Sequence, residues 1–383
     1  MKLLILSHLY PHRASHTSGI FVHHQALTLA AKAQVQVVAP TPWWPLPWGV
    51  WGRRSQSPRH EVVDGVQLHR PRFLALPRRW RFHRQWRRYE AAVKRVVTEP
   101  PDVIHAHCAY PDGYVAQRLG KLWNRPVYIT VHGYDVHELP KLNPRWRELI
   151  CDALTGADRV VSVSDELASG VLEMGVGEER VLRLPNGVDC DLFPPRAERE
   201  RRVPQILFVG RFQQSKGLGV LLEAIDLLND GKRQFRLRCV GGNTLHPAAP
   251  FRQQAQRLGI QGLTRFDDEV PWLQIPQVMA GADLLVLPSF SEGMPLVLLE
   301  AMAAGLPVVA THCGGPSEIV DDAWGELIEP GDAIQLAAAL ARVLDNLSAY
   351  DPVELQQRAR RMYDYRTLAE RLHSDYDEIL AAY

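Results

Sequence analysis

Two glutamates eight residues apart stand in a segment whose other residues suit the binding of phosphate. The segment covers residues 288–309 and reads PSFSEGMPLVLLEAMAAGLPVV, with the glutamates at Glu292 and Glu300. An apolar strand ends at its first proline and a loop follows. The pattern then predicts a helix over about 295–304, because proline suits the first helical turn and a Gly-Leu-Pro triplet would end it.

The start of that helix is the predicted phosphate site. Backbone amides in the first turn of a helix have no partner inside it and attract anions. Glu300 lies roughly 7 Å further along the helix at 1.5 Å per residue, where it would reach the ribose of a nucleotide whose phosphates occupy the amides. Glu292, in the preceding loop, would face the transferred group. The predicted donor-binding residues at the start of the helix are Gly293, Met294, Pro295, Leu296 and Val297.

Two glutamates at this spacing could instead be solvated acids at a helix end. The glycine, the proline and the apolar helix between them disfavour that interpretation.

A second strand, loop and helix pattern covers residues 206–218, ILFVGRFQQSKGL, and places two cations just after the strand. The carboxyl ends of strands are where α/β sheets bind ligands. Negative charge grows on a departing diphosphate, and Arg211 and Lys216 would stabilise it. Taken alone, both would be ordinary surface charges.

The first half of the chain carries two further candidates. His132 follows an apolar run over 127–131 and is a candidate catalytic residue, although an isolated loop histidine commonly forms only structural hydrogen bonds. Gly19 lies between the first strand and the first helix, where a glycine would let the backbone approach phosphate or sugar closely; the other interpretation is an ordinary turn. The motif GxGxxG is absent from this loop, which disfavours a simple NAD dehydrogenase.

These motifs lie in two α/β units in tandem. Apolar runs predict strands over 2–7, 34–40, 103–106, 127–131 and 159–164, and again over 205–210, 235–240, 283–288 and 307–311, with helical patterns between them. A charged, proline-rich segment at 191–204 has the composition of a linker. We predict a first domain over 1–195, a second domain over 203–362 and a C-terminal helix over 363–383.

Charge is concentrated in one segment. The net charge of +1 disfavours a general polyanion binder, but residues 70–95 hold ten Lys and Arg against one acid, Glu90, with aromatic residues between them and the apolar stretch 43–48 upstream. The segment from Arg70 to Arg95 could contact an anionic membrane. Equally, it could be a solvated helix whose aromatic residues pack inward. Nucleic-acid binding is disfavoured because no RNA- or DNA-binding motif is present.

The remaining composition bears on location. Five scattered cysteines without a CxxC pair indicate a reducing compartment, the apolar start is too short for a signal peptide, and no run of about 18 to 20 apolar residues occurs. The expectation is a cytoplasmic protein, with contact at the inner face of the membrane as a possibility for the basic segment.

Taken together, these motifs resemble glycosyltransferase family 4. The two-glutamate segment, the Gly-Arg and Lys-Gly pattern around Arg211 and Lys216, and His132-Gly133 match that family. The resemblance implies the GT-B fold: two Rossmann-like, doubly wound parallel-sheet domains that face each other across a cleft, with the C-terminal helix returning to the first domain. It also implies a nucleotide-sugar donor in the second domain, a glycan or lipid-linked glycan acceptor in the first, transfer with retention of configuration, and no metal or other cofactor.

Further segments narrow the resemblance. Leu9-Tyr10-Pro11, Gly19-Ile20-Phe21-Val22, the segment 109–113 and the segment 132–135 are similar to glycosyltransferases of teichuronic acid and exopolysaccharide synthesis. Uridine is the expected base, although the segments 241–244 and 266–271 depart from the family pattern beside it.

Other functions fit the same scaffold. A nucleotide-sugar epimerase or a glycan phosphorylase would share it, but no motif for the pyridoxal phosphate lysine of a phosphorylase is evident. A catalytically silent protein that binds nucleotide sugar is the candidate from another class. The presence of both glutamates, His132, Arg211 and Lys216 argues against that silent role.

Overall fold

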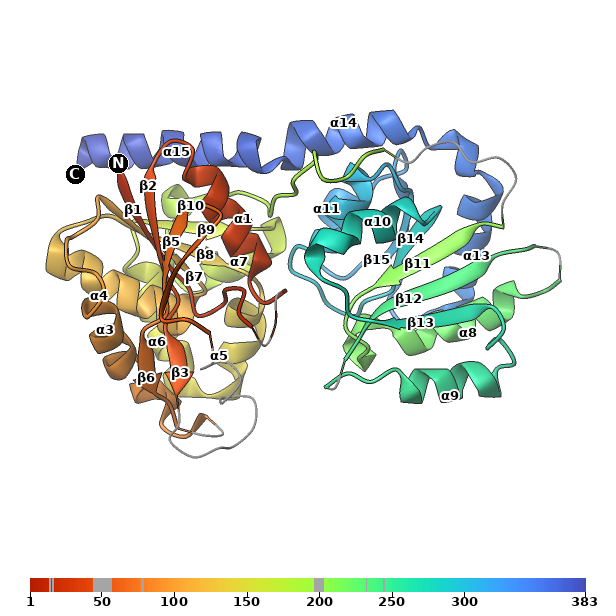
Figure 1. Ribbon diagram of the computed structural model, residues 1–383, viewed down its shortest axis with the longest axis horizontal. Coiled ribbons are helices and arrows are strands. Elements are labelled where there is room, and N and C mark those ends of the chain that lie inside the picture. Colours follow the sequence, from red (N-terminus) through yellow and green to blue (C-terminus); the bar gives the residue numbers. More distant parts are fainter. Residues whose placement is uncertain are drawn as a thin grey trace. The chain divides into compact units, whose positions relative to one another are not determined.

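The computed structural model describes residues 1–13, 15, 17–43, 57–76, 79–195, 203–231, 233–243 and 245–383. These residues form two compact units, Met1–Asn186 with Tyr365–Tyr383, and Gly187–Asp364 (Figure 1). The chain therefore divides after residues 186 and 364, where the sequence predicted ends at 195 and 362. Within the predicted linker 191–204, residues 196–202 lie outside the described residues, as do residues 44–48 of the apolar stretch.

The first unit is built on an eight-stranded sheet in the order β10-β9-β8-β7-β1-β2-β5-β4. Its strands are β1 (Lys2–Leu6), β2 (Gln34–Val38), β4 (His60–Val63), β5 (Val66–His69), β7 (Val103–His107), β8 (Val127–Val131), β9 (Arg159–Ser162) and β10 (Val181–Arg183), while β3 (Thr41–Trp43) and β6 (Arg72–Leu74) form a separate pair. All neighbours in the large sheet are parallel except β4 and β5, which form an antiparallel pair at one edge. The predicted doubly wound parallel sheet is confirmed, apart from this edge.

Helices cover both faces of that sheet. They are α1 (Ile20–Leu29), α3 (Trp86–Lys94), α4 (Tyr114–Trp123), α5 (Leu139–Leu142), α6 (Pro144–Thr155), α7 (Asp165–Glu173) and α15 (Tyr365–Ala382). Leu3 and Ile5 of β1 share one core with Val22 of α1 and Leu372 of α15, so α1 and α15 cover the same face. Helix α4 packs against both α3 and α6. The C-terminal helix returns to the first domain, as predicted.

The second unit has a six-stranded, all-parallel sheet in the order β13-β12-β11-β14-β15-β16. Its strands are β11 (Gln205–Val209), β12 (Arg236–Gly242), β13 (Thr264–Asp268), β14 (Leu284–Leu287), β15 (Val308–Thr311) and β16 (Gly325–Ile328); its helices are α8 (Leu218–Leu228), α9 (Ala249–Arg257), α10 (Ile275–Ala280), α11 (Leu296–Ala303), α12 (Pro316–Ile319), α13 (Ala333–Asp345) and α14 (Pro352–Tyr363). In chain order this is the 3-2-1-4-5-6 arrangement of a Rossmann sheet.

The strand order decides where a ligand can bind in the second unit. It reverses between the adjacent strands β11 and β14. Ligands of open α/β sheets bind at such a switch point. Both predicted phosphate motifs follow these two strands, so the topology brings them together.

Candidate active site

Two loops of the second unit are joined by an ion pair between residues 76 positions apart in sequence. Lys216 Nζ donates to Glu292 Oε1 over 2.6 Å, and the buried Ser289 Oγ donates to the same oxygen, also over 2.6 Å. The backbone amide of Phe290 donates to the Ser215 carbonyl at 2.9 Å. The loop after β11 and the loop after β14 therefore form one structure around the Glu292 carboxylate.

Two glycines allow this close approach. Gly217 has a φ of 68°, and a Cβ atom there would lie 1.8 Å from the Pro288 carbonyl oxygen. A Cβ atom on Gly315, in the loop after β15, would lie 1.9 Å from the Gly293 carbonyl oxygen. No side chain fits at either position without moving the backbone, so these glycines set the packing of the three loops.

Glu292 is also held by its backbone. Its amide donates to the Cys313 carbonyl at 2.8 Å, and its carbonyl accepts from the Gly315 amide at 3.2 Å. The Glu292 side chain is only 10% exposed, against 19% for Lys216. The pair is thus largely removed from water, and each charge depends on the other for compensation.

Fewer free backbone amides lie at the start of α11 than the sequence predicted for residues 293–297. The helix begins at Leu296 with Pro295 as its N-cap, and the Leu298 amide already bonds to the Pro295 carbonyl. Pro295 has no N–H, so it cannot donate to a phosphate. Within the helix geometry, the first-turn amides of Leu296 and Val297 have no carbonyl of their own helix to bond. Gly293 and Met294 lie in the turn before them.

Glu300 lies on α11 beyond this turn, and its side chain is half-buried. Its carboxylate forms no hydrogen bond or ion pair with any residue that the structure describes, and burial alone raises the pKa of Glu300 to about 7. A carboxyl group desolvated without a partner favours its neutral form. A ligand hydroxyl would supply the partner that the protein does not.

Arg211 forms no side-chain hydrogen bond or ion pair with Lys216 or Glu292. It directly follows the loop residue Gly210, its side chain is exposed, and it makes no ion pair with any described residue. The structure therefore joins Lys216 and Glu292 directly, while the Arg211 side chain remains exposed to solvent.

In the first unit, His132 directly follows β8. One carboxylate orders its loop: Asp135 accepts from the amides of His132, Gly133 and Ala109 at 3.0, 3.1 and 2.9 Å. This carboxylate is buried, and three amides stabilise it there. The Asp135 contacts tie the loop after β8 to the loop after β7.

The His132 ring belongs to a row of three near-parallel histidine rings. Its Nε2 lies 3.1 Å from His107 Nδ1, and the His107 ring stacks on His105 with centroids 4.9 Å apart. His105 Nδ1 and Nε2 in turn bond Tyr376 Oη of α15 and Thr130 Oγ1, at 2.5 and 2.6 Å. Burial lowers the pKa of His132 and of His105 to about 3, so both are neutral at physiological pH.

The sequence analysis missed His105 and His107. A signal was present, because residues two apart on a strand face the same side and His105-Ala106-His107 ends β7. His132 Nδ1 and His107 Nε2 are buried without a hydrogen-bond partner among the described residues. Unpartnered buried nitrogens next to a loop end are a place where a ligand can bind.

Gly19 has a structural reason to be glycine. It is the N-cap of α1 with a φ of 66°, and a Cβ atom there would lie 2.3 Å from the Leu9 carbonyl oxygen. Close packing against residue 9 therefore requires glycine whether or not a ligand approaches.

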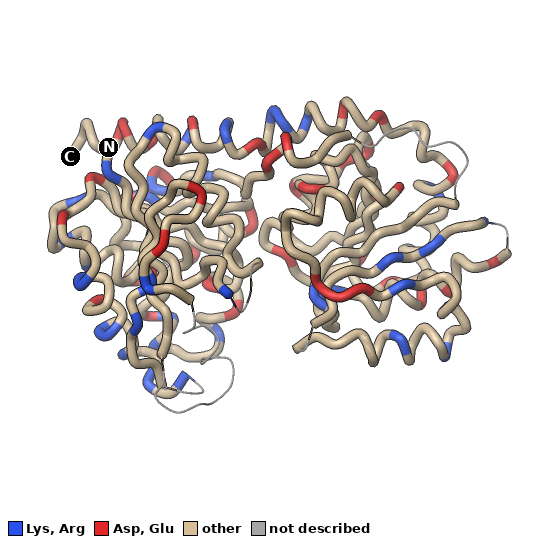
Figure 2. Tube along the Cα trace, viewed as in Figure 1, with Lys and Arg blue, Asp and Glu red and all other residues tan. Residues whose placement is uncertain are grey.

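The basic segment from Arg70 to Arg95 has buried aromatic residues, as a solvated helix packed on the core would, and also exposed cations that could contact a membrane. Arg70 is buried and paired with Glu61, and Tyr89 is buried against Phe73 with ring centroids 5.3 Å apart. Trp80, in contrast, is 63% exposed. Figure 2 shows Lys and Arg side by side along this part of the first unit. The exposed residues are Arg79, Arg81, Arg84, Arg87, Arg88, Lys94 and Arg95, while Arg78 lies outside the described residues.

Two family models match the chain. "Glycosyltransferase Family 4" matches residues 18–192, and "Glycosyl transferases group 1" matches residues 203–346. The D-inositol 3-phosphate glycosyltransferase of Corynebacterium efficiens is 31% identical over 73% of this chain and 72% of its own length. The chain is therefore a glycosyltransferase and belongs to family 4.

Within that family, a relative covers the whole chain. A Bacillus subtilis (strain 168) protein described as a teichuronic acid biosynthesis glycosyltransferase, TuaC, is 28% identical over 99% of both chains. This agrees with the subgroup that the N-terminal segments resemble.

Solved structures confirm the GT-B fold. The sucrose-phosphate synthase of Thermosynechococcus elongatus superposes with a TM-score of 0.83 at 21% identity over all of both chains. Anabaena HepE, solved in complex with UDP-glucose, gives 0.72 at 20% identity over all of both chains. Among the described residues, no helix is both long enough and apolar enough to cross a membrane.

Proposed function

We propose that the protein transfers a sugar, with retention of configuration, from a UDP-sugar to a glycan or lipid-linked glycan of the cell surface. The observation that carries this proposal is the Lys216–Glu292 pair beside the first amides of α11, at the switch point of a Rossmann sheet. Relatives support the choice of donor and product: HepE was solved with UDP-glucose, and TuaC is described in teichuronic acid biosynthesis.

The positions of positive charge in the second unit determine where the donor diphosphate would bind. The diphosphate lies against the amides of Leu296 and Val297, where the helix dipole favours an anion. Lys216 moves its Nζ from Glu292 to a phosphate oxygen, and Arg211 adds a second cation. Freed from Lys216, the Glu292 carboxylate accepts hydrogen bonds from hydroxyls of the transferred sugar. Glu300 accepts from the ribose hydroxyls.

The reaction then needs no nucleophile from the protein. The bond between the anomeric carbon and the diphosphate oxygen breaks, and its electron pair stays on that oxygen, where Lys216 and Arg211 stabilise the charge. The acceptor hydroxyl attacks the same face of the sugar, and its proton passes to the departing phosphate. His132 contacts the sugar from the first domain. Positive charge comes from side chains and amides, so the proposal includes no metal ion.

The proposed acceptor is found at a membrane, and the basic segment could hold the enzyme there. The exposed arginines around Trp80 offer an anionic surface both cations and an aromatic side chain. A cytoplasmic enzyme held there would meet lipid-linked acceptors at the inner face of the cell membrane.

A screen of UDP-, GDP- and ADP-sugars for binding and slow hydrolysis tests the donor assignment. We expect saturable binding of UDP-sugars and hydrolysis that Glu292→Ala abolishes, with Arg342→Ala, a surface residue paired with Glu326, as the matched control. Product analysis separates transferase from epimerase. Binding without turnover, even with lipid-linked acceptors present, would establish the silent role instead, and no binding would refute the site.

The pKa of Glu300 predicts how donor affinity depends on pH. Above pH 7 the carboxylate is ionised and accepts two ribose hydroxyls; as the pH falls through 7 it gains a proton and loses one acceptor position. We therefore expect the Kd of a UDP-sugar, measured by calorimetry from pH 5.5 to 8.5, to rise towards low pH by about tenfold, one charged hydrogen bond. The nucleotide sugar itself has no proton to gain in that range.

Glu300→Gln is the control for this pH dependence. It should bind weakly at every pH, because its amide offers a single acceptor oxygen. An unchanged pH profile in Glu300→Gln would assign the titration to another group.

A further inference from the structure

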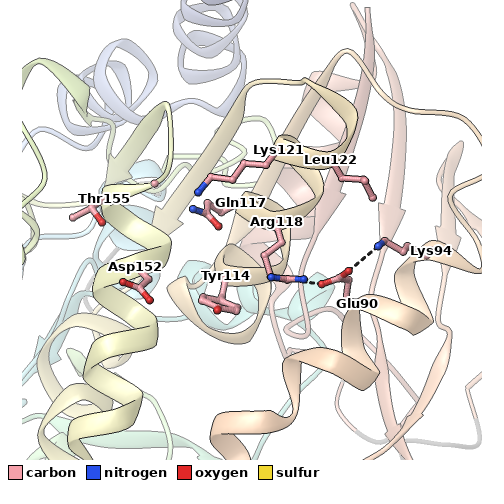
Figure 3. A pocket seen from close by; sticks show the side chains of 10 residues that line it. Glu90, Lys94, Tyr114, Gln117, Arg118, Lys121, Leu122, Asp152 and Thr155 are labelled. Carbon is pink, nitrogen blue, oxygen red and sulfur yellow. Dashed lines mark hydrogen bonds and ion pairs between the residues drawn. The ribbon is translucent and has the colours of Figure 1, made fainter.

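A pocket of about 660 Å³ lies in the first unit between α3, α4 and α6. It is on the opposite face of the sheet from α1, α15 and the histidine row, and His132 does not line it. Figure 3 shows side chains from α3 and α4 on one side and Asp152 and Thr155 of α6 on the other. Nothing in the donor site uses these residues.

Three cations line the pocket, and one carboxylate holds two of them in place. Glu90 accepts from Lys94 Nζ at 2.7 Å and from Arg118 Nε at 2.6 Å. The Arg118 guanidinium also lies 4.2 Å from the centre of the Trp86 ring. Lys121, one turn further along α4, and Asp152 of α6 form no ion pair with any described residue. Three cations against two carboxylates leave the pocket lining with a net positive charge of one.

Gln117 gives the second, independent indication of a ligand. It is only 9% exposed, lines the pocket, and forms no hydrogen bond with any described residue. Figure 3 shows its amide between Lys121 and Arg118. A Cβ atom on Gly156 would lie 2.2 Å from Gln117 Nε2, so glycine at 156 makes room for this amide. The side-chain amide is not among the fully buried groups of the described residues, so it faces the pocket with donor and acceptor positions that the protein does not use.

We propose that this pocket binds an acidic sugar unit, in which a carboxylate or phosphate group is attached to a ring bearing hydroxyls. The anionic group pairs with Lys121 and Arg118. The Gln117 amide and the Asp152 carboxylate form hydrogen bonds with the ring hydroxyls. A carboxylate can accept from two neighbouring hydroxyls, and an amide can accept from one and donate to the other. The volume is within the range of small-molecule sites. The site would hold a charged unit of a glycan chain away from the transfer reaction.

Calorimetric titration of the full chain with D-glucuronate and D-glucose 6-phosphate, and with D-glucose as the uncharged probe, tests this. We expect saturable binding of both acids and binding of glucose weaker by about tenfold or more, the value of one charged hydrogen bond. Equal binding of glucose and glucuronate would overturn the proposal. So would the absence of binding of either acid together with binding of phosphatidylglycerol vesicles that Lys121→Ala abolishes, which would make the pocket a lipid site.

Variants locate the binding in the pocket. Lys121→Ala and Gln117→Leu should each weaken the Kd of glucuronate by about tenfold, whereas Lys32→Ala, a surface lysine paired with Glu370, should not change it. If Gln117→Leu does not fold, Gly156→Ala displaces the same amide. Donor hydrolysis should remain at the wild-type rate in all of them, which separates this site from the proposed donor site. Unchanged glucuronate binding in Lys121→Ala and Gly156→Ala would refute it.

A titration with an acidic oligosaccharide distinguishes a glycan chain from a free sugar acid or sugar phosphate as the ligand. An acidic oligosaccharide that binds more tightly than D-glucuronate would identify a glycan chain as the occupant. If it binds more weakly than either monosaccharide, the pocket takes a free sugar acid or sugar phosphate.

Discussion

Lys216→Ala is expected to lower kcat/KM for sugar transfer by about 10²- to 10³-fold, the usual loss when one group that stabilises transition-state charge is removed. Lys216 is the cation that the structure places next to Glu292, at 2.6 Å, and Glu292 lies four residues before the first residue of α11. Charge develops on the diphosphate as the glycosidic bond breaks, so the loss should fall mainly on kcat. Initial rates with a saturating UDP-sugar measure it.

The same substitution leaves Glu292 without its partner. Because the Glu292 side chain is only 10% exposed, an unpaired carboxylate there costs stability. The thermal midpoint of Lys216→Ala must therefore be measured beside its activity. Lys216→Arg, which keeps the charge, should retain stability even where its geometry lowers the rate.

A double-mutant cycle separates pairing from catalysis. Lys216→Ala and Glu292→Gln together should lower kcat/KM by more than the product of the two single effects. The proposed mechanism breaks their contact when the donor binds, so each single substitution also removes a contact that the free wild-type enzyme must give up. Multiplicative effects would show that the two residues act independently. A kcat/KM for Lys216→Ala above a tenth of the wild-type value would contradict the role given to Lys216.

The sequence predicted the strand, loop and helix that carry the proposed donor site because their signals are local. The buried strand β14 is a short apolar run, and proline and glycine bound helix α11. Such patterns report burial and chain direction within a few residues. They therefore located Glu292, Glu300 and the helix start, all of which lie within one strand, loop and helix unit.

Contacts distant in sequence were not predictable in this way. The Lys216–Glu292 pair depends on β11 and β14 being neighbours, which is a property of strand order and not of either segment. The antiparallel strand β4 was missed because residues 60–63 are half exposed at a sheet edge and carry little apolar pattern. Gln117 could not be predicted for the same reason. The sequence pattern of an amphipathic helix does not report whether the side-chain amide of a glutamine has a hydrogen-bond partner.

The histidine row leads to the second large expected effect. His132→Ala should lower kcat/KM by about 10²-fold if its ring contacts the sugar as proposed. His107 should matter although it is one residue further from the substrate. In a neutral pair, one ring must donate and the other accept across the 3.1 Å contact between His132 Nε2 and His107 Nδ1. The His107 tautomer thereby decides whether His132 Nδ1 carries a proton.

Matched substitutions at His107 test this positioning role. His107→Asn places an amide atom where Nδ1 was and should retain most activity, whereas His107→Leu should lower kcat by about tenfold, the value of one buried hydrogen bond. Nitrogen-15 chemical shifts of the His132 ring report its tautomer directly. They should show one tautomer in the wild type and in His107→Asn, and a mixture in His107→Leu.

The pH profile of kcat distinguishes a positioning role of His107 from a loss of activity caused by disturbed packing. Burial holds the pKa of His132 near 3. We therefore expect kcat at saturating UDP-sugar, where the effect of Glu300 on donor affinity no longer enters, to show no histidine titration between pH 5 and 8 in the wild type. His107→Leu removes a neighbour without adding solvent, and the profile should stay flat while kcat falls. A new inflection near pH 6.5 in that variant would mean that the ring had become exposed, and the loss would then be a packing effect.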